Sequence, residues 1–506
     1  MSHLKHIRVL APLTAFLIVI TILATARGVL VQAASLVTVS GADPYASCVN
    51  AGEPGTVSVN AEVEPYVAVN PHLAGNIVGV WQQDRWNNGG AHGLVAGFSF
   101  DGGATWGETT LPFSSCAPNA ILDPFTGAPY DRASDPWVSI GPDGTAYAVG
   151  LLATNNTISG NNDTGVAAVT SSDGGKTWGN ARLIKSDQGT SPIFEVTQFF
   201  NDKESVTADP IHAGTAYAVW DRTKSPSHSP DAALRAHAFR GPTWFSKTTD
   251  GGNTWTGTRA IFDPGQNSQT IGNQIVVDPR TDVLYDFFEL IKTTGSPKFI
   301  PRGLSVGVIS SSDGGATWTQ PTIVSAQQTA NDFATNGALL RTGAGLPAAA
   351  IDASTGQLYV VWEDARFTGG TANQVVISTS TNGGTSWSTP AAISKTPNTL
   401  AAFTTTVAVN SAGSVGVTYY DMRNPDGITT GLPTDYWLVT STDHGATFPT
   451  EARITPTSFD MSLAPNAGGL FLGDYEGLTT IGATFEPFFV HTVSSSNPTD
   501  AFTTFI

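Results

Sequence analysis

Ser99-Phe-Asp-Gly-Gly-Ala-Thr-Trp106 is the most informative segment of this 506-residue chain, because variants of it recur five more times. Asp-Gly favours the positive φ angles of a hairpin turn, and the Asp carboxylate can accept hydrogen bonds from turn N–H groups. The Thr hydroxyl can close the loop, and the final aromatic ring can bury a large apolar area between neighbouring sheets. The recurrence indicates a repeat architecture. The other copies occupy residues 171–178, 248–255, 311–318, 380–387 and 441–448.

Two short apolar segments separated by turn residues lie ahead of each copy, as expected for a pair of neighbouring β-strands. A seventh pair of segments follows the last copy of the motif. The seven pairs begin at residues 65, 137, 205, 274, 348, 406 and 475.

Seven pairs of segments and six turn motifs leave a seventh sheet incomplete. Residues 501–506 supply one further strand, and residues 36–39 near the N-terminus supply another. Their pairing would complete the sheet and remove two exposed edges. We therefore predict an all-β fold for residues 34–506, a single seven-bladed β-propeller with four-stranded antiparallel blades, closed by the N-terminal strand. A six-bladed propeller is the alternative.

The amino-acid composition argues against two classes of binding partner, nucleic acids and anionic membranes. The chain has 24 Lys and Arg against 41 Asp and Glu, a net charge of −17, and only 13% of its residues are charged. So few basic residues argue against nucleic acid or an anionic membrane, which both require clustered Lys and Arg. A hydrophobic content of 40% is sufficient for a packed core.

Residues 1–33 have the pattern of a secretory signal peptide. Lys5 and Arg8 precede an apolar run over residues 9–24, and small residues follow it. The run is shorter than the roughly 20 residues that span a bilayer, so cleavage is predicted and an uncleaved anchor is the alternative. We expect a secreted, extracellular protein without membrane attachment after cleavage. Export favours a disulfide between Cys48 and Cys116, with two free buried thiols as the alternative.

Charged residues gather where strands would begin or end opposite the turn motifs. Such a one-sided ring of acids, arginines and tyrosines is typical of a binding or catalytic site. The segments that enter the first strands contain Glu64, residues 130–135, residues 202–204, Asn273 and residues 473–476. The segments that leave the second strands contain Asp84-Arg85, Asp221-Arg222, residues 363–366 and residues 421–423.

The eight-residue motif resembles the Asp-box, or bacterial neuraminidase repeat, of sialidases and their relatives. In that family the motif joins the third and fourth strands of a blade, away from the active site, and is structural. The resemblance therefore implies no catalytic role for Asp101 or its equivalents. It implies a secreted exo-glycoside hydrolase that cleaves terminal sialic acid, or a related acidic sugar, with an aspartate acid, a Tyr–Glu pair and three arginines.

Carried onto this chain, the resemblance makes Asp135 the acid and Tyr475 the nucleophile, assisted by Glu204. Planar arginine forks suit a substrate carboxylate. The family's aromatic-Arg-x-Pro signature is absent from the first blade, where Glu64-Pro65-Tyr66 stands instead. The residues assigned to substrate binding are Arg132, Arg222 and Arg366, with Arg85 or Arg423 as substitutes and Asp474 beside Tyr475.

Two other functions remain open at this stage. One is a non-catalytic propeller that binds a glycan or a protein, and the other is a hydrolase of neutral polysaccharide that uses Asp135 and Asp474. The Asp–Arg strand ends could equally be structural ion pairs, Lys203-Glu204 a surface pair and Tyr475 a packing residue. We expect a monomer with a glycan or glycoconjugate substrate and no cofactor, although calcium could bind the carboxylate-rich face.

Overall fold

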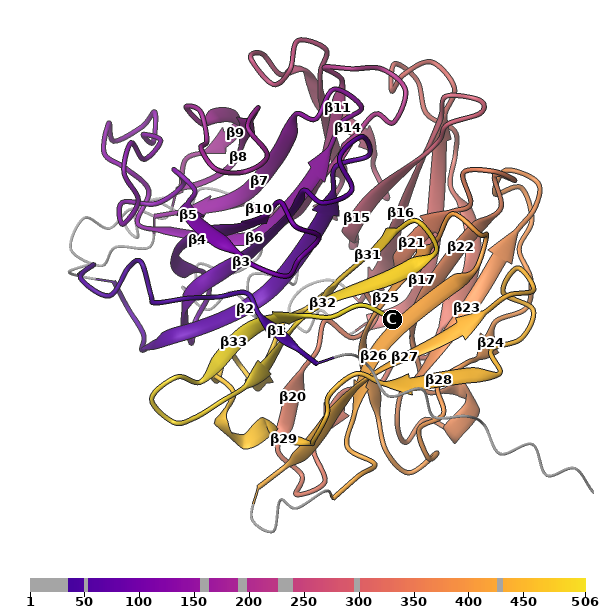
Figure 1. The fold of residues 1–506 in the computed structure, drawn as a ribbon. Coiled ribbons are helices and arrows are strands. Elements are labelled where there is room, and N and C mark those ends of the chain that lie inside the picture. Colours follow the sequence, from indigo (N-terminus) through magenta and orange to yellow (C-terminus); the bar gives the residue numbers. More distant parts are fainter. Residues whose placement is uncertain are drawn as a thin grey trace, which may run out of the picture.

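The computed structural model describes residues 35–49, 53–154, 163–189, 198–225, 240–294, 301–425 and 431–506. Over these ranges the chain forms 33 strands and two short 3₁₀ turns, η1 (Arg366–Thr368) and η2 (Met461–Leu463), without an α-helix (Figure 1). The predicted all-β class is confirmed. No helix in this part of the chain has the length and apolar character needed to cross a membrane. The predicted signal segment, residues 1–33, lies outside the described residues.

Antiparallel pairing groups most of the described strands into seven four-stranded units, each numbered here in chain order. Unit 1 contains β2 (Val57–Val69), β3 (Ile77–Trp86), β4 (Ala91–Ser99) and β5 (Gly107–Thr110). Unit 2 contains β6 (Arg132–Ile140), β7 (Ala146–Ala153), β8 (Thr164–Ser171) and β9 (Arg182–Asp187). Unit 3 contains β10 (Gln198–Ala208), β11 (Ala216–Ser225), β13 (Thr243–Thr248) and β14 (Thr256–Phe262). Unit 4 contains β15 (Ser268–Asp278), β16 (Val283–Thr293), β17 (Pro301–Ser311) and β18 (Thr322–Gln327).

Unit 5 contains β21 (Ala348–Ile351), β22 (Leu358–Asp364), β23 (Gln374–Ser380) and β24 (Ala391–Ala392). Unit 6 contains β25 (Ala402–Val409), β26 (Val415–Asp421), β27 (Pro433–Ser441) and β28 (Thr450–Arg453). Unit 7 is β31 (Gly477–Ile481), β32 (Thr484–Thr492), β33 (Thr499–Thr503) and the N-terminal β1 (Val37–Thr38). The remaining short strands are β12 (Arg240–Gly241), β19 (Asp332–Phe333), β20 (Leu339–Arg341), β29 (Phe459–Asp460) and β30 (Leu470–Phe471).

The first strands of consecutive units lie next to one another. Contacts run from β2 to β6, β10, β15, β21, β25 and β31, and β31 in turn contacts β2. The contacts of the first strands thus return to the strand from which they began, and a side chain at the start of one of them can meet side chains from several units.

The two ends of the chain meet in unit 7. Val37 is paired with Thr503 and Thr38 with Phe502, and β1 and β33 lie side by side in Figure 1. The predicted pairing of the N-terminal strand with the last C-terminal strand is confirmed. The predicted disulfide between Cys48 and Cys116 is also present, and it ties the N-terminal segment to the loop after β5.

The repeated motif forms the predicted turn. Asp101 accepts hydrogen bonds from the Ser99 hydroxyl (2.8 Å), the Thr105 amide (2.9 Å) and the Thr105 hydroxyl (2.6 Å). Equivalent bonds occur at Asp173, Asp250, Asp313 and Asp443, and at Asn382 in the fifth copy. Each turn joins the third and fourth strands of its unit.

The aromatic ring that ends the motif packs between sheets, as predicted. Trp106 of unit 1 lies 5.8 Å from Phe488 of unit 7, and Trp387 of unit 5 lies 5.7 Å from Phe287 of unit 4, between ring centroids. Each ring thus buries its area against the unit beside its own.

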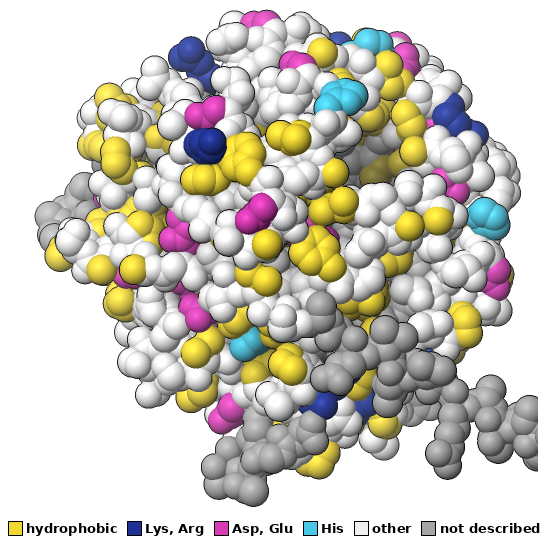
Figure 2. Space-filling view, in the orientation of Figure 1, with side chains coloured by type: hydrophobic (Ala, Val, Ile, Leu, Met, Phe, Trp, Pro, Cys, Tyr) yellow, Lys and Arg dark blue, Asp and Glu magenta, His cyan; other side chains and the backbone are white. Residues whose placement is uncertain are grey.

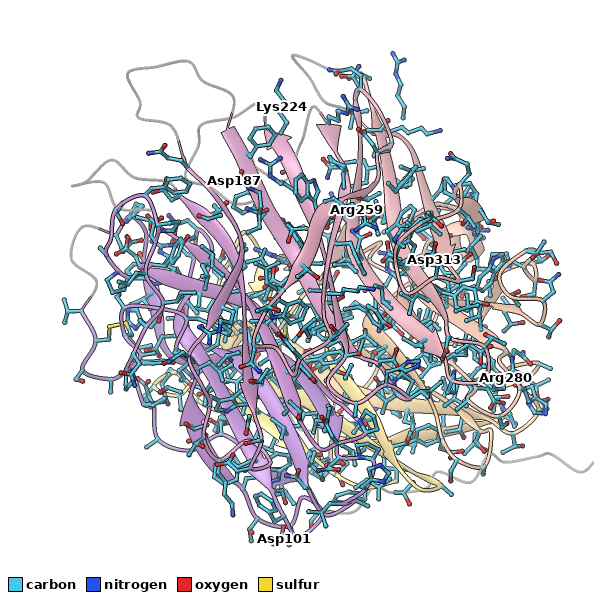
Figure 3. The ribbon with its side chains drawn as sticks, turned by 90° about the horizontal axis from the view of Figure 1, so that it is seen from above. Asp101, Asp187, Lys224, Arg259, Arg280 and Asp313 are labelled. Carbon is cyan, nitrogen blue, oxygen red and sulfur yellow. A yellow bond between two sulfur atoms is a disulfide. The ribbon has the colours of Figure 1, made fainter. Side chains whose placement is uncertain are left out.

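Strand register separates these turns from the start of the first strands. In unit 2, Ile140 at the end of β6 is paired with Ala146, which is paired with Ser171 of the turn motif. Arg132, at the start of β6, lies at the other end of the same sheet. Figure 3 shows Asp101 at one end of the molecule and Asp187 and Lys224 at the opposite end.

Three equivalent tryptophans mark the cores between sheets. Trp81, Trp220 and Trp362 each occupy the fifth position of the second strand of their unit and are fully buried. The Trp362 indole N–H also donates a hydrogen bond to Asp364 Oδ2 (2.9 Å). Each ring therefore contributes both apolar burial and a satisfied polar group.

Substitution of Trp362 by Ala should lower the free energy of unfolding by about 3–5 kcal/mol, because it leaves a large cavity in a packed core. Urea denaturation monitored by circular dichroism measures the change. Phe125→Ala is the control, since Phe125 is exposed and its loss should change stability by no more than about 0.5 kcal/mol. Equal effects of the two substitutions would contradict the assigned core position.

Candidate active site

A cavity of about 510 Å³ opens at the end of the molecule opposite the turn motifs. Its walls come from the starts of β6 and β10, from β16, from β20 and from the segment that precedes β31. On the face drawn in Figure 2, the charged side chains are scattered among apolar and uncharged ones. The cavity, by contrast, gathers both acids and cations, among them Arg85, Arg132, Asp135, Asp202, Lys203, Glu289, Asp332, Arg341 and Asp474.

A repeated backbone irregularity places several of these side chains. The first strands of units 1, 2, 3, 4 and 6 each carry a bulge whose leading residue has a positive φ angle. Bulges re-aim side chains and are common beside functional sites, and a positive φ in a residue other than glycine is strained. The leading residues are Glu64 (φ 52°), Asp135 (φ 53°), Lys203 (φ 49°), Gly272 (φ 69°) and Thr404 (φ 49°).

The bulges bring the Lys203 ammonium group to Glu64 and Asp135, and Asp474 reaches it from the segment before β31. Lys203 Nζ lies 3.1 Å from Glu64 Oε1, 3.0 Å from Asp135 Oδ2 and 2.7 Å from Asp474 Oδ2. The four side chains are buried and come from units 1, 2 and 3 and from the segment that leads into unit 7. Buried charges of this kind are stable only when they are paired and hydrogen-bonded.

Arg341 completes this cluster from outside the seven units. It lies on β20, which pairs with β19 and with β30 in a separate three-stranded sheet. Its guanidinium holds Asp474 in a bidentate pair, with Nε 3.1 Å from Oδ1 and Nη2 2.6 Å from Oδ2. The guanidinium also stacks on Phe471, 4.5 Å from the ring centroid.

The pKa shifts show how the cluster balances its charge. Burial alone would raise the pKa of Asp474, but Arg341 and Lys203 hold it far below its usual value. Burial would also raise the pKa of Asp135, yet Lys203 and the Ser134 hydroxyl keep it low. For Glu64, burial and the charge of Asp135 outweigh Lys203 and raise the pKa to about 8. At neutral pH two cations, Lys203 and Arg341, thus face two carboxylates and a largely protonated Glu64.

Three further carboxyl groups line the cavity outside this cluster, namely Asp202, Glu289 and Asp332. Asp202 accepts a hydrogen bond from the Lys203 backbone N–H (3.1 Å). Burial and the neighbouring charge of Asp135 raise its pKa to about 6. Glu289 projects from β16 and is 5% exposed, and burial raises its pKa to about 8. Within the described part of the chain, Glu289 has neither an ion-pair nor a hydrogen-bond partner.

The wall around Glu289 is apolar. Ile271 is its cross-strand partner on β15, Ile291 lies two residues further along β16, and Leu304 is paired with Ile291. All three side chains line the cavity. An uncompensated carboxyl group in such a wall favours the neutral form, which can donate a proton.

Four residues predicted from the sequence are brought together here, namely Asp135, Asp474, Arg85 and Arg132. Arg132 is occupied by an ion pair with Glu53 (2.5 Å) and stacks on Trp86. Arg85 is 2% exposed and donates through Nη1 to Gln82 Oε1 (2.7 Å). Arg85 forms no ion pair within the described residues, whereas Arg132 and Arg341, the other arginines of the cavity, are each paired with a carboxylate.

The other predicted arginines do not reach the cavity. Arg222 pairs with Asp187, Arg366 with Asp364 (2.7 Å), and Arg423 with both Asp421 (2.5 Å) and Glu451 (2.9 Å). None of the three lines the cavity. The expectation that they converge on one substrate carboxylate therefore has to be corrected, because each already holds a carboxylate of the protein.

Tyr475 and Glu204 lie deeper, along a smaller cavity of about 50 Å³. The Tyr475 hydroxyl donates to the Pro136 carbonyl (2.9 Å), and its ring packs 5.2 Å from Trp137. Burial and the surrounding carboxylates raise the pKa of Tyr475, which disfavours a phenolate. Glu204 is buried, and neither of its oxygens has a hydrogen-bond partner in the described part of the chain. Tyr475 and Glu204, predicted as nucleophile and assisting group, thus form no hydrogen bond with each other.

Sequence reasoning missed Lys203, Glu289 and Arg341. Lys203 belongs to a segment expected at the site, residues 202–204, but no role follows for it from the sequence and a surface pair with Glu204 is the alternative; the structure makes it the buried centre of the cluster. Glu289 had a signal, since it is an acid among apolar neighbours in Phe287-Phe-Glu-Leu-Ile291. Arg341 had none, because its position depends on a strand pairing between distant segments.

The number of acids at this end is what made a calcium site there an expectation. Among the described residues, no group of three or more His, Cys, Asp or Glu side chains is arranged to hold a metal ion. At the centre of the acidic cluster stands the ammonium group of Lys203.

Comparison with known proteins gives a distant structural likeness. No family model matches this chain, and no curated protein matches its sequence. An α-L-arabinanase of Penicillium chrysogenum is 11% identical with a TM-score of 0.46, covering 93% of this chain and 98% of its own. The Hadza microbial sialidase Hz136 is 15% identical with a TM-score of 0.44, covering 86% and 73%. The α-L-arabinofuranosidase Arb93A of Fusarium graminearum is 12% identical with a TM-score of 0.44, covering 94% and 98%. At these values the likeness identifies neither an activity nor site residues in this chain.

Substitution of Lys203 by Met should lower the free energy of unfolding by about 3–5 kcal/mol at pH 7, because it leaves buried carboxylates without a partner. The depressed pKa values of Asp135 and Asp474 contribute stability above the unfolded pKa of about 4, and that contribution is lost as the pH falls. The difference between wild type and variant should therefore shrink below about pH 4. Urea titrations across this range measure it, and a difference independent of pH would argue against the cluster.

Proposed function

We propose that the seven four-stranded units are the blades of a seven-bladed β-propeller. The contacts of the first strands, which pass from β2 to β31 and return to β2, support this arrangement. The pairing of β1 with β33 supports closure by the N-terminal strand. With residues 1–33 as a secretory signal, we propose that the propeller acts outside the cell.

We propose that this propeller is a glycoside hydrolase whose substrate binds in the 510 Å³ cavity. One observation carries the proposal, namely that the cavity holds two carboxyl groups whose environments set different pKa values. Asp202 has a pKa of about 6 and Glu289 a pKa of about 8. Glycoside cleavage requires one carboxylic acid and one carboxylate around the scissile bond, and separated pKa values allow both at neutral pH.

The roles follow from the two environments. Glu289, protonated in its apolar wall, donates a proton to the leaving oxygen as the glycosidic bond breaks. Asp202, ionised above about pH 6, supplies the second carboxylate. Asp135, predicted from the sequence to be the acid, is held ionised by Lys203 and has no proton to give at neutral pH. Asp135 instead positions Lys203, and thereby Asp202, the residue next to Lys203 in the sequence.

Arg85 favours an acidic sugar as the substrate. Its buried guanidinium lines the cavity without a carboxylate partner in the described part of the chain. A substrate carboxylate would satisfy that charge with strong, directional hydrogen bonds. Sialic acid, suggested by the repeat motif, is one such sugar, and in this structure it would be bound by Arg85 rather than by three converging arginines.

The hydrolase should show a bell-shaped pH dependence of kcat/KM with limbs near pH 6 and pH 8. Activity rises as Asp202 loses its proton and falls as Glu289 loses its own. A screen of fluorogenic sialosides, uronides and arabinosides identifies the substrate and gives the profile.

In the same assay Glu289→Gln should lower kcat/KM by about 10² to 10⁴ and remove the alkaline limb, and Asp202→Asn should remove the acidic limb. Asp101→Asn, in a turn motif at the other end, is the matched control and should retain activity. Full activity in Glu289→Gln would refute the assignment. Glycan binding without any turnover would instead favour the non-catalytic propeller.

Arg85→Gln should raise KM for the acidic sugar by about 10-fold or more, because one charge-assisted contact is lost. Hydrolysis of a neutral glycoside accepted by the wild type should not weaken. Circular dichroism confirms that the variant folds. An equal loss on neutral and acidic sugars would contradict the assigned carboxylate contact.

A further inference from the structure

A pair of exposed apolar side chains stands at the rim of the cavity. Phe333 on β19 is 55% exposed and Leu339 on β20 is 42% exposed. They are direct cross-strand partners in an antiparallel pair, so both project from the same face of the hairpin. This rim pair, Phe333 and Leu339, therefore forms one small apolar surface rather than two isolated side chains.

The hairpin that carries the rim pair is firmly held from its other face. Asp332 and Leu340, the neighbouring cross-strand pair, are both buried. Asp332 accepts hydrogen bonds from the Thr342 hydroxyl (2.8 Å) and the Asn373 side-chain amide (2.9 Å). Leu340 is paired with Leu470 of β30. The rim pair is thus fixed in place before any ligand arrives, which lowers the entropic cost of binding.

The rim pair is continuous with the cavity. Leu339 lines the cavity itself, and so do Arg341 at the end of the same strand and Thr342 directly after it. At the other extreme Lys203 and Asp474 are shared with the deeper, smaller cavity and form the floor. A ligand with its polar end on this charged floor would leave the cavity across Phe333 and Leu339.

The chemistry of this surface suits one kind of occupant. A sugar ring has a flat C–H face that can pack on an aromatic ring, while its hydroxyl groups stay at the edge and reach water. A charged group would gain nothing from the rim pair, because neither Phe333 nor Leu339 offers a hydrogen bond. Among the parts of a glycan substrate, the sugar on the leaving-group side is the part that would lie here.

We propose that Phe333 and Leu339 form a subsite for the leaving-group sugar, so that the preferred substrate has at least two sugar residues. This inference rests on the proposed glycoside hydrolase activity. It adds a determinant of substrate length, which the acids in the cavity do not supply.

The test compares two substrates that share the terminal sugar released by the wild type, one the methyl glycoside and the other an oligosaccharide of two to four residues. In Phe333→Ala, KM for the oligosaccharide should rise by about 10-fold and kcat/KM for the methyl glycoside should stay within about twofold. Phe125→Ala is the matched control, because Phe125 is 45% exposed and does not line the cavity. Its kinetics should be unchanged on both substrates.

Unchanged kinetics in Phe333→Ala, or an equal loss on both substrates, would overturn the subsite while leaving the hydrolase proposal intact. A wild type that hydrolyses no glycan would contradict the hydrolase proposal instead. In that case a printed glycan array decides the subsite: oligosaccharide binding that is lost in Phe333→Ala supports it, and absent or unaltered binding overturns it.

Discussion

The ammonium group of Lys203 holds together parts of the chain that are far apart in sequence. It contacts Glu64, Asp135 and Asp474, which come from units 1 and 2 and from the segment before unit 7. Replacing a buried ion cluster by apolar residues is often neutral for stability, whereas removing one partner is costly. The cluster is therefore better understood as a device that fixes the starts of the first strands than as a source of net stability.

Charge balance explains why five ionisable groups can be buried so close together. Lys203 and Arg341 neutralise Asp135 and Asp474, and the raised pKa of Glu64 leaves that group largely uncharged at neutral pH. Arg341 reaches the cluster only because β20 pairs with β30, outside the regular sheets. A short strand outside the seven units thus supplies the second positive charge that the buried carboxylates require.

The same cavity contains two kinds of carboxyl group, and the difference lies in their neighbours. Asp135 and Asp474 face cations and stay ionised, while Glu289 faces Ile271, Ile291 and Leu304 and keeps its proton. Such a division is what acid–base chemistry at neutral pH demands. In the function proposed above, Arg85 would add an anion contact and the rim pair an apolar surface for the remainder of a substrate.

Local sequence was enough to predict the all-β class, the six turn motifs, the pairing of residues 36–39 with the last strand and the Cys48–Cys116 disulfide. The first three depend on short-range turn chemistry, on apolar segments or on an unpaired edge, and the disulfide on two cysteines in a chain expected to be exported. It also placed Asp135, Asp474 and Arg85 at the correct end of the sheets.

Only the tertiary structure decided which charged residues meet. Arg222, Arg366 and Arg423 look like substrate ligands in the sequence, yet each is neutralised by an acid beside it. Lys203 is buried where the bulged starts of first strands from different units converge. The pKa of Glu289 is raised because that carboxyl group is buried, beside Ile271 of β15 and two residues from Ile291 of its own strand. Burial and ion pairing depend on contacts between units, and those contacts are set by the packing of whole sheets rather than by any local motif.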